Sequence, residues 1–167
     1  MRRKLGIVLA VGITSAPALA APHTITEQDI TVSARPIRGQ TAQDIACLAY
    51  SIFREAGTLS QPAQYAVGQI HINRLKTGAW GQQLCQVVFA PAQFSWTLSP
   101  RRTPWTQQQM QHARAIAWNL IQGVRVKGLD SEHVLHYHAD YVMPRWGRHQ
   151  QVVATAGPHI FYRDVAY

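Results

Sequence analysis

The chain has 167 residues, 47% hydrophobic and 14% charged, which is enough apolar material for one domain and too little charge for a disordered chain. Its 16 Lys and Arg residues outnumber 8 Asp and Glu residues, so the formal net charge is +8. Two cysteines exclude a disulfide-dense scaffold and a four-cysteine zinc site, and no fixed-period repeat is present.

The N-terminus has the three parts of a secretory signal peptide. Arg2-Arg3-Lys4 forms a positive start, residues 5–13 form a short apolar run, and Ala18-Leu19-Ala20 gives the small-x-small pattern of a cleavage site. Residues 1–20 are therefore predicted to be a signal peptide. The alternative is an uncleaved membrane anchor, but the apolar run is short for a bilayer span. We expect export across the inner membrane into the periplasm, with no membrane span after cleavage.

Export affects how the charge and the cysteines are interpreted. Cleavage after Ala20 would remove three basic and no acidic residues, which leaves a net charge of +5. Such a charge suits cell-wall polymer or a membrane surface, and no nucleic acid partner is expected outside the cell. In an oxidising compartment Cys47 and Cys85 would most often pair, contributing roughly 3–4 kcal/mol in the chain-entropy model. Free buried thiols and a catalytic cysteine are the alternatives.

Apolar periodicity and capping signals predict a helical domain over residues 41–167, preceded by a poorly ordered lead-in over 21–40. The lead-in carries prolines and, at 30–33, a short extended piece. The later predicted elements are, in chain order, helices over 41–56, 60–74, 82–89 and 104–122 (the last capped by Thr103), a loop or short strand over 94–100, and strands over 133–139 and 160–163. Helices followed by a little strand favour an α+β domain, mainly helical.

Glu55 stands apart among the few acidic residues. It lies at the end of an apolar helix, directly before Gly57. A carboxyl group in such a half-buried setting would have a raised pKa and could be protonated near neutral pH, as a general acid for glycosidic cleavage requires. On position alone, however, a surface residue paired with Arg54 or Arg74 is the plainer interpretation.

Two further groups of residues are candidates for a site. His136, His138 and Asp140 alternate along a predicted strand and would share one face, where they could hold zinc with His159 or bind sugar hydroxyls. No HExxH-type signature is present, so no metal is predicted, and without a phosphate loop or dinucleotide fingerprint no cofactor is predicted. Aromatic residues in predicted loops, at 94, 96 and 146, suit a carbohydrate groove or the core equally well.

Several short motifs also follow one another in a fixed order. They are Cys47-Leu48-Ala49, Glu55-Ala56, Ala66-Val67, Asn73-Arg74, Gln93-Phe94-Ser95-Trp96, His136-Tyr137-His138-Ala139-Asp140-Tyr141-Val142, Pro144, Trp146, Gly157, His159 and Phe161-Tyr162-Arg163. Together, over about residues 44–164, they resemble the SleB/CwlJ-type cell-wall hydrolases. The resemblance implies a small lysozyme-like α+β domain with a short β element near the C-terminus. It also implies an enzyme that cleaves peptidoglycan glycan strands between N-acetylmuramic acid and N-acetylglucosamine, by a lytic transglycosylase route.

The resemblance also assigns roles to residues. Glu55 matches the first glutamate of the family's Glu-Ala-Arg-Gly-Glu stretch and is the expected catalytic acid. The expected substrate-binding residues are Asn73, Gln93, Phe94, Trp96, Tyr137, His138, Asp140, Trp146, His159 and Tyr162. The sequence departs from the family after Ala56, where Gly57-Thr58-Leu59 stands in place of Arg-Gly-Glu. Arg54, on the other side of Glu55, could replace the missing positive charge, although its direction on the helix differs from that of the family arginine.

Two alternatives from other classes remain. One is a non-catalytic peptidoglycan-binding protein whose motif has decayed after Ala56. The other is a metal-dependent wall amidase or peptidase built on His136, His138 and Asp140. Wall remodelling, spore germination, opening of the wall for cell-envelope machinery and phage lysis would all use the same domain.

Overall fold

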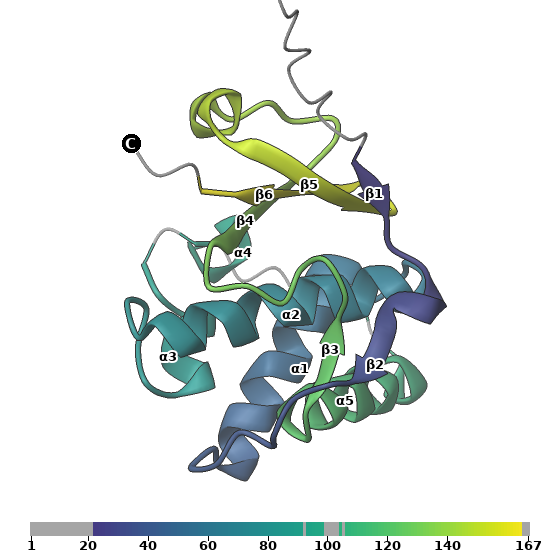
Figure 1. The fold of residues 1–167 in the computed structure, drawn as a ribbon. Helices are drawn as coiled ribbons and strands as arrows, with labels where there is room; N and C mark the ends of the chain where they lie inside the picture. Colours follow the sequence, from purple (N-terminus) through teal and green to yellow (C-terminus); the bar gives the residue numbers. More distant parts are fainter. Residues whose placement is uncertain (1–21, 92, 99–103, 105, 165–167) are drawn as a thin grey trace, which may run out of the picture.

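The helices begin and end close to where capping residues and apolar periodicity place them. The computed structural model describes residues 22–91, 93–98, 104 and 106–164. Its helices are α1 (Ala42–Ala56), α2 (Gln61–Thr77), α3 (Leu84–Val88), α4 (Ser95–Leu98) and α5 (Gln107–Ile121), with 3-10 turns η1 (Glu27–Asp29) and η2 (Arg145–His149) (Figure 1). The predicted helices are therefore confirmed, with shifts of a few residues at their ends.

Capping boxes with a threonine cap start the long helices α1 and α5. At α1 the Thr41 hydroxyl accepts from the Asp44 N–H, and the Asp44 carboxylate accepts from the Thr41 N–H. Thr106 and Gln109 make the same pair of bonds at α5. The expected cap of α5, Thr103, lies outside the described residues, and the helix itself starts later than predicted.

The strands form two small sheets. They are β1 (His23–Thr24), β2 (Ile30–Val32), β3 (Val124–Val126), β4 (Val134–Ala139), β5 (Gln151–Ala156) and β6 (His159–Arg163). The larger sheet has the order β1-β5-β6-β4, with β4 at one edge, and β2 pairs with β3 in the smaller one. Both β4 and β6 were predicted, whereas β1, β3 and β5 were not. Strands β1 and β3 have only two and three residues, and the six residues of β5 do not alternate between polar and apolar.

The structure differs from the expectation of a poorly ordered lead-in over 21–40. Here β1 pairs in parallel with β5, and β2 pairs antiparallel with β3. The expected extended piece at 30–33 corresponds to β2. The lead-in is therefore tied to the domain through two strands whose partners lie far away in sequence, and the domain begins before residue 41. The predicted signal peptide, 1–20, lies outside the described residues.

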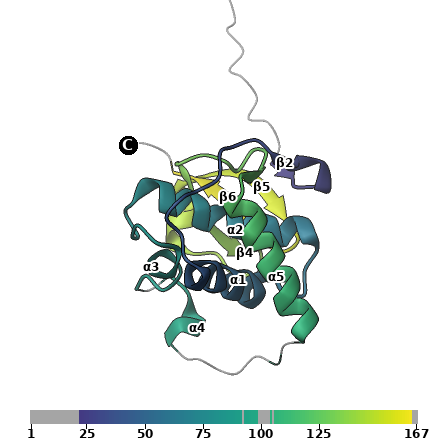
Figure 2. The same ribbon diagram turned by 90° about the horizontal axis from the view of Figure 1, so that it is seen from below.

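The core lies between α1, α2 and α5 and the inner face of the larger sheet (Figure 1). Seen from below, α1 lies between α3 and α5 (Figure 2). Buried Leu48 and Ile52 on α1 and Ile70 on α2 belong to one apolar cluster. Helices α2 and α5 approach closely at Gly68, where a Cβ atom would lie 2.4 Å from Cδ1 of Leu120. In the described part of the chain, no helix is long and apolar enough to cross a membrane.

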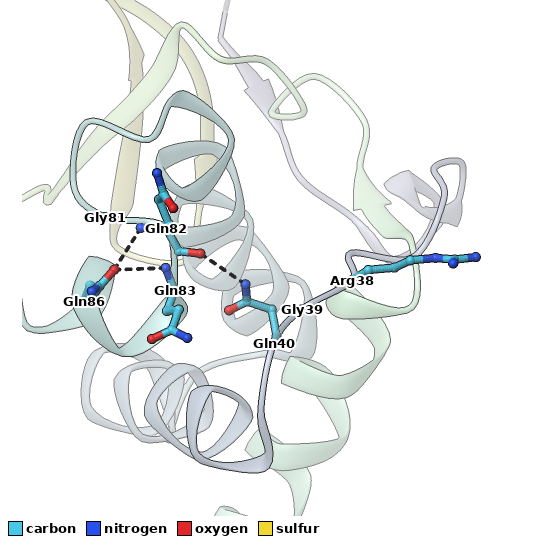
Figure 3. A pocket seen from close by; sticks show the side chains of 7 residues that line it. All are labelled: Arg38, Gly39, Gln40, Gly81, Gln82, Gln83 and Gln86. Atoms are coloured by element: carbon cyan, nitrogen blue, oxygen red, sulfur yellow. Dashed lines mark hydrogen bonds between the residues drawn. The ribbon is translucent and has the colours of Figure 1, made fainter.

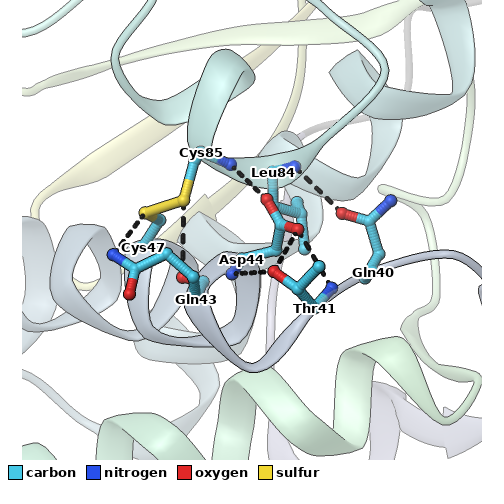
Figure 4. Close-up of a disulfide and its surroundings, with 7 residues drawn as sticks. All are labelled: Gln40, Thr41, Gln43, Asp44, Cys47, Leu84 and Cys85. Carbon is cyan, nitrogen blue, oxygen red and sulfur yellow. Dashed lines mark hydrogen bonds between the residues drawn. A yellow bond between two sulfur atoms is a disulfide. The ribbon is translucent and has the colours of Figure 1, made fainter.

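The helix α3 is fastened to α1 by a covalent and a polar link (Figure 4). Cys47 on α1 and Cys85 on α3 form a disulfide, as expected from the sequence. Beside it, Asp44 accepts a hydrogen bond of 3.0 Å from the Cys85 N–H. The start of α1 is thus joined to the element that leads into residues 93–98.

Candidate active site

A cleft of about 500 Å³ opens where the end of α1 faces the larger sheet. Its lining comes from α1, α2, the segment before α4, β4 and the start of β6. The lining residues are Arg54, Glu55, Arg74, Gln93, Phe94, Tyr137, His138, Ala139, Tyr141, Val142 and His159. Of the residues expected to act in catalysis or substrate binding, this cleft brings together Glu55, Gln93, Phe94, Tyr137, His138 and His159.

Glu55 is the half-buried carboxylate of this cleft, and two hydrogen-bond donors face it. The indole Nε1 of Trp96 donates to Oε1 over 2.5 Å, and the hydroxyl of Tyr137 donates to Oε2 over 3.3 Å. Burial raises the pKa of Glu55, although these two bonds and the charges of Arg54 and Arg74 each act to lower it. The side chain therefore holds a proton to higher pH than an exposed glutamate does.

The position of Trp96 is fixed by other rings. Its indole stacks on Phe94, with centroids 5.3 Å apart, and meets Tyr50 and Phe89 edge-on at 5.5 and 6.0 Å. Trp96 lies on α4, a single helical turn, where the sequence predicted a loop or short strand. Because a helical turn directs Trp96 back toward α1, its N–H can reach Glu55.

Tyr137 remains a donor over a wide pH range. Burial raises its pKa well above the ordinary value, and the neighbouring charge of Glu55 adds to the shift. Its ring contacts His159 edge-on at 5.2 Å, and His159 also lines the cleft. Burial lowers the pKa of His159, which favours the neutral imidazole, and its Nδ1 has no hydrogen-bond partner in the described part of the chain.

Two arginines place positive charge near Glu55. The Arg54 guanidinium lies 5.2 Å from the Trp96 ring centroid and donates a hydrogen bond to the Tyr50 hydroxyl. Arg54 also lines the cleft, although it precedes Glu55 on the helix. Arg74 is buried and donates from Nε to the Leu135 carbonyl, and its Nη1 has no partner among the described residues.

Asn73 does not lie in the cleft, contrary to the role expected for it. Its amide nitrogen donates to the carbonyl oxygens of Leu129 and Val134 over 2.7 and 2.8 Å, and its oxygen accepts from Gln69. These bonds join α2 to the segment that leads into β4. Asn73 therefore has a structural role at the boundary between helices and sheet.

Side chains alternate along β4, so the remaining residues expected to bind substrate lie on two different faces of the sheet. Tyr137 faces Glu55, so His136 and His138 point to the opposite face of the sheet, although His138 still reaches the cleft rim. Trp146 contacts both histidines, and Tyr162 hydrogen-bonds to His138 over 2.7 Å. The structure thus places Trp146 and Tyr162 away from Glu55.

The zinc ligands considered from the sequence are not assembled. His136 pairs with Asp164 at 3.0 Å, whereas His138 pairs with Tyr162. Asp140 is exposed just beyond the end of β4, close enough to His159 to act on its charge. Within the described ranges, no three His, Cys, Asp or Glu side chains lie together so that they could hold a metal ion.

Sequence reasoning did not assign several cleft residues. Tyr141 and Val142 line the rim from the loop after β4, and Arg74 lines the interior from α2. Arg74 adjoins Asn73 in a quoted motif, but no local pattern shows which of the two side chains faces the cleft. The hydrogen bond from Trp96 to Glu55 joins residues 41 positions apart and has no sequence signal.

A second cleft, of about 440 Å³, lies between the lead-in and the start of α3 (Figure 3). Amide side chains dominate it: Gln40 donates to the Gln82 carbonyl, and Oε1 of Gln86 accepts from the N–H groups of Gln82 and Gln83. Its described lining holds no carboxylate or imidazole. It therefore lacks the acid–base groups that the first cleft contains.

Comparisons with known proteins identify the fold and the family. The structure resembles the crystal structure of the catalytic domain of the Bacillus cereus SleB protein, with a TM-score of 0.61 and 20% sequence identity over 77% of this chain and 95% of that chain. This likeness confirms the mainly helical, lysozyme-like α+β fold. No curated protein sequence matches. A family model described as Cell Wall Hydrolase matches residues 60–162, a region that begins after Glu55. The chain therefore belongs to the cell wall hydrolase family.

Proposed function

We propose that the protein cleaves the peptidoglycan glycan strand between N-acetylmuramic acid and N-acetylglucosamine as a lytic transglycosylase, with Glu55 as both acid and base. The observation that carries the proposal is the setting of Glu55. Among the described residues that line the cleft, it is the one carboxylate, and burial raises its pKa. A protonated carboxyl facing an open cleft is what the first step of glycosidic cleavage needs.

In the first step, Glu55 protonates the bridging oxygen. The bond between that oxygen and the anomeric carbon of the muramyl sugar breaks, and positive charge develops on the sugar. Glu55 is left as a carboxylate. The N–H of Trp96 and the hydroxyl of Tyr137 stabilise that carboxylate through their hydrogen bonds, and the charges of Arg54 and Arg74 favour it.

In the second step, the Glu55 carboxylate removes the proton from the C6 hydroxyl of the same muramyl sugar. The hydroxyl oxygen attacks the anomeric carbon and closes a 1,6-anhydro ring, and Glu55 returns to its protonated form. Water is not the nucleophile, so a second carboxylate is not required, unlike in most glycosidases. This route matches a cleft with a single described carboxylate.

The other described acids of α1 and of the region around β4 and β6 do not line the cleft. Asp44 is held by Thr41 and Cys85 at the far end of α1, and Asp164 pairs with His136 on the opposite face of the sheet. Asp140 is exposed beyond the end of β4 and does not line the cleft. If the enzyme uses water instead, Asp140 is the first candidate for a second carboxylate.

A non-catalytic peptidoglycan-binding protein is the second candidate function. It is favoured by the segment after Glu55, where the family pattern places a second glutamate and this chain has Leu59. The Leu59 side chain packs against the hydrophobic core, so that position supplies no charge to the cleft. A protein of this kind would bind sacculi and release no fragments.

The location belongs to the same proposal. A signal peptide over 1–20 would deliver the domain across the inner membrane, and the periplasm would give it access to peptidoglycan. The disulfide between Cys47 and Cys85 is typical of an oxidising compartment. Cell-envelope machinery that needs an opening in the wall is a candidate partner.

Release of dye from labelled sacculi tests the catalytic role of Glu55. We expect Glu55→Gln to lower the rate about 100-fold or more, because the amide cannot donate the required proton. Glu132→Gln is the matched control, since Glu132 is exposed on a turn, and its rate should equal that of the wild type. A Glu55→Gln protein with a near-wild-type rate contradicts the proposal, whereas a wild type that binds sacculi and releases nothing favours the second candidate.

A further inference from the structure

We propose that the sheet carries a second saccharide-binding surface, on the side away from Glu55. It consists of Trp80, His136, Trp146, Gln150 and Asp164 and is called the Trp80–Trp146 surface below. Its ligand would be the uncharged amino-sugar units of a glycan strand, an identity that rests on the proposed function.

The Trp80–Trp146 surface lies at the edge strand β4. His136 and Tyr137 are neighbours on this strand, so their side chains point to opposite faces, and Tyr137 faces Glu55. The rings of Trp80 and Trp146 both contact the imidazole of His136, with centroids 6.3 and 5.3 Å from it. These three rings therefore form a group that is separate from the aromatic residues around Glu55.

The polar groups of the Trp80–Trp146 surface meet at the Asp164 carboxylate. One oxygen of Asp164 receives bonds from Nδ1 of His136 over 3.0 Å and from Nε2 of Gln150 over 2.7 Å. Because a carboxylate only accepts, Nδ1 of His136 carries a hydrogen, and its Nε2 is the second polar atom of the ring. In the described part of the chain, neither this Nε2 nor the buried Oε1 of Gln150 has a partner.

This pattern selects a ligand that supplies donors. The Asp164 carboxylate, whose side chain is 37% exposed, only accepts hydrogen bonds and would favour hydroxyl or amide N–H groups. Pyranose rings combine hydroxyl donors with apolar C–H faces, and such faces pack against aromatic rings. The Trp80–Trp146 surface offers both kinds of contact side by side.

Its aromatic rings are held in place and remain accessible. Trp146 is 38% exposed, and its ring is supported by His138 and Tyr162 at centroid distances of 5.6 and 5.5 Å. Trp80 is half-buried, with the Arg74 guanidinium 5.5 Å from its ring centroid. Rings fixed in this way lose little conformational entropy when a ligand binds.

The two binding regions meet at His138. This residue lines the cleft that contains Glu55 and also contacts the ring of Trp146. A glycan strand that fills the cleft and extends past His138 would therefore reach Trp146. The surface would hold the strand beyond the two sugars at the scissile bond.

Titration of the full chain carrying Glu55→Gln with peptide-free glycan strands, followed by NMR, tests this inference. The imidazole C–H signals of His136 and the indole N–H signals of Trp80 and Trp146 report on the surface, and the indole N–H of Trp96 reports on the cleft. We expect both sets of signals to shift. We also expect an added Trp146→Ala to weaken strand affinity about five- to tenfold. Trp118→Ala is the matched control, because Trp118 is 49% exposed on α5, and its effect should be less than twofold.

The two regions give separable outcomes. A response of Trp96 without one from His136 and Trp146 overturns the second surface and leaves the proposed function standing. A response of His136 and Trp146 alone supports the surface and contradicts binding in the cleft, whereas no response from either set overturns both. A response of the surface to free stem peptide and none to glycan strands overturns its assignment to saccharides.

Discussion

At the scale of single residues, burial and hydrogen bonding have opposite effects on the pKa of Glu55. Burial favours its neutral form, whereas Trp96, Tyr137 and the two arginines favour the carboxylate, and burial has the larger effect on the pKa. This balance suits a group that must give up a proton and take one back, because the site contains influences that favour each form. Removing the charge should therefore raise the stability of the protein and lower its activity.

Substituting Glu55→Gln should change the stability of the protein in a pH-dependent way. A folded-state pKa above that of the unfolded chain means that the glutamate destabilises the fold increasingly as pH rises through its folded pKa. Glutamine keeps the shape and an acceptor for Trp96 but does not titrate. Urea denaturation measures the free energies of unfolding of the wild type and of Glu55→Gln. We expect the two values to be closest near pH 4, and Glu55→Gln to become increasingly more stable than the wild type toward pH 8.

Glu132→Gln serves again as the control for that measurement. The Glu132 carboxylate is exposed, so the free energy of unfolding of Glu132→Gln should differ from that of the wild type by a nearly constant amount over the same pH range. A difference for Glu55→Gln that is equally flat, or that shrinks as pH rises, would show that burial does not govern the proton affinity of Glu55.

The sequence identified Glu55 but could not identify its donors. An apolar helix end and a family-like motif pointed to Glu55, whereas Trp96 and Tyr137 reach it from 41 and 82 positions away. Similarly, strand alternation showed that His136 and His138 share a face, but not that this face points away from Glu55. Asn73 was misplaced because an amide on a helix gives no local sign of the buried carbonyls that it will meet.

At the scale of elements, Asp44 links the start of α1 to α3. It caps its own helix through Thr41 and also accepts from the Cys85 N–H, beside the disulfide. Burial would raise the pKa of Asp44, but the bonds from Cys85 and Thr41 together lower it. Its contribution to stability is therefore present at neutral pH and is lost as pH falls through the lowered pKa.

Replacing Asp44 by alanine should cost about 2–3 kcal/mol of unfolding free energy at pH 7, because two backbone N–H groups lose their acceptor in a buried site. Gln109→Ala removes the equivalent capping-box residue of α5, whose capping bonds are exposed and which makes no bond to another element of the described chain, so its cost should be about 0.5–1 kcal/mol. Chemical denaturation of both variants measures the difference. Equal costs would mean that the bond to Cys85 contributes nothing to the junction of α1 with α3.

Local signals predicted helices better than strands. Capping boxes and apolar periodicity are contained within one helix, so α1 and α2 were located to within a few residues. Strands β1 and β2 have two and three residues, and their partners are β5 and β3, more than 90 positions along the chain. The lead-in was therefore read as poorly ordered, since nothing local marks the pairing that fixes it.

At the scale of the whole molecule, the fold brings the end of α1 against the inner face of β4. Helices come first in the chain and most of the sheet comes last, and this order was enough to predict a mainly helical α+β domain. The sheet order β1-β5-β6-β4 could not be predicted, because it depends on pairing between the two ends of the chain. The resulting cleft combines α1, residues 93–98 and β4, three parts that are distant in sequence.

The most direct test of the account is the product that the protein makes from purified peptidoglycan, identified by mass spectrometry with Glu55→Gln as the control. We expect muropeptides that end in 1,6-anhydro-N-acetylmuramic acid with the wild type and none with the variant. Muropeptides with reducing ends would show that water is the nucleophile, which contradicts the proposed second step and points to Asp140. Free stem peptides would show that the enzyme cuts amide bonds, which contradicts the assignment of the cleft to the glycan strand.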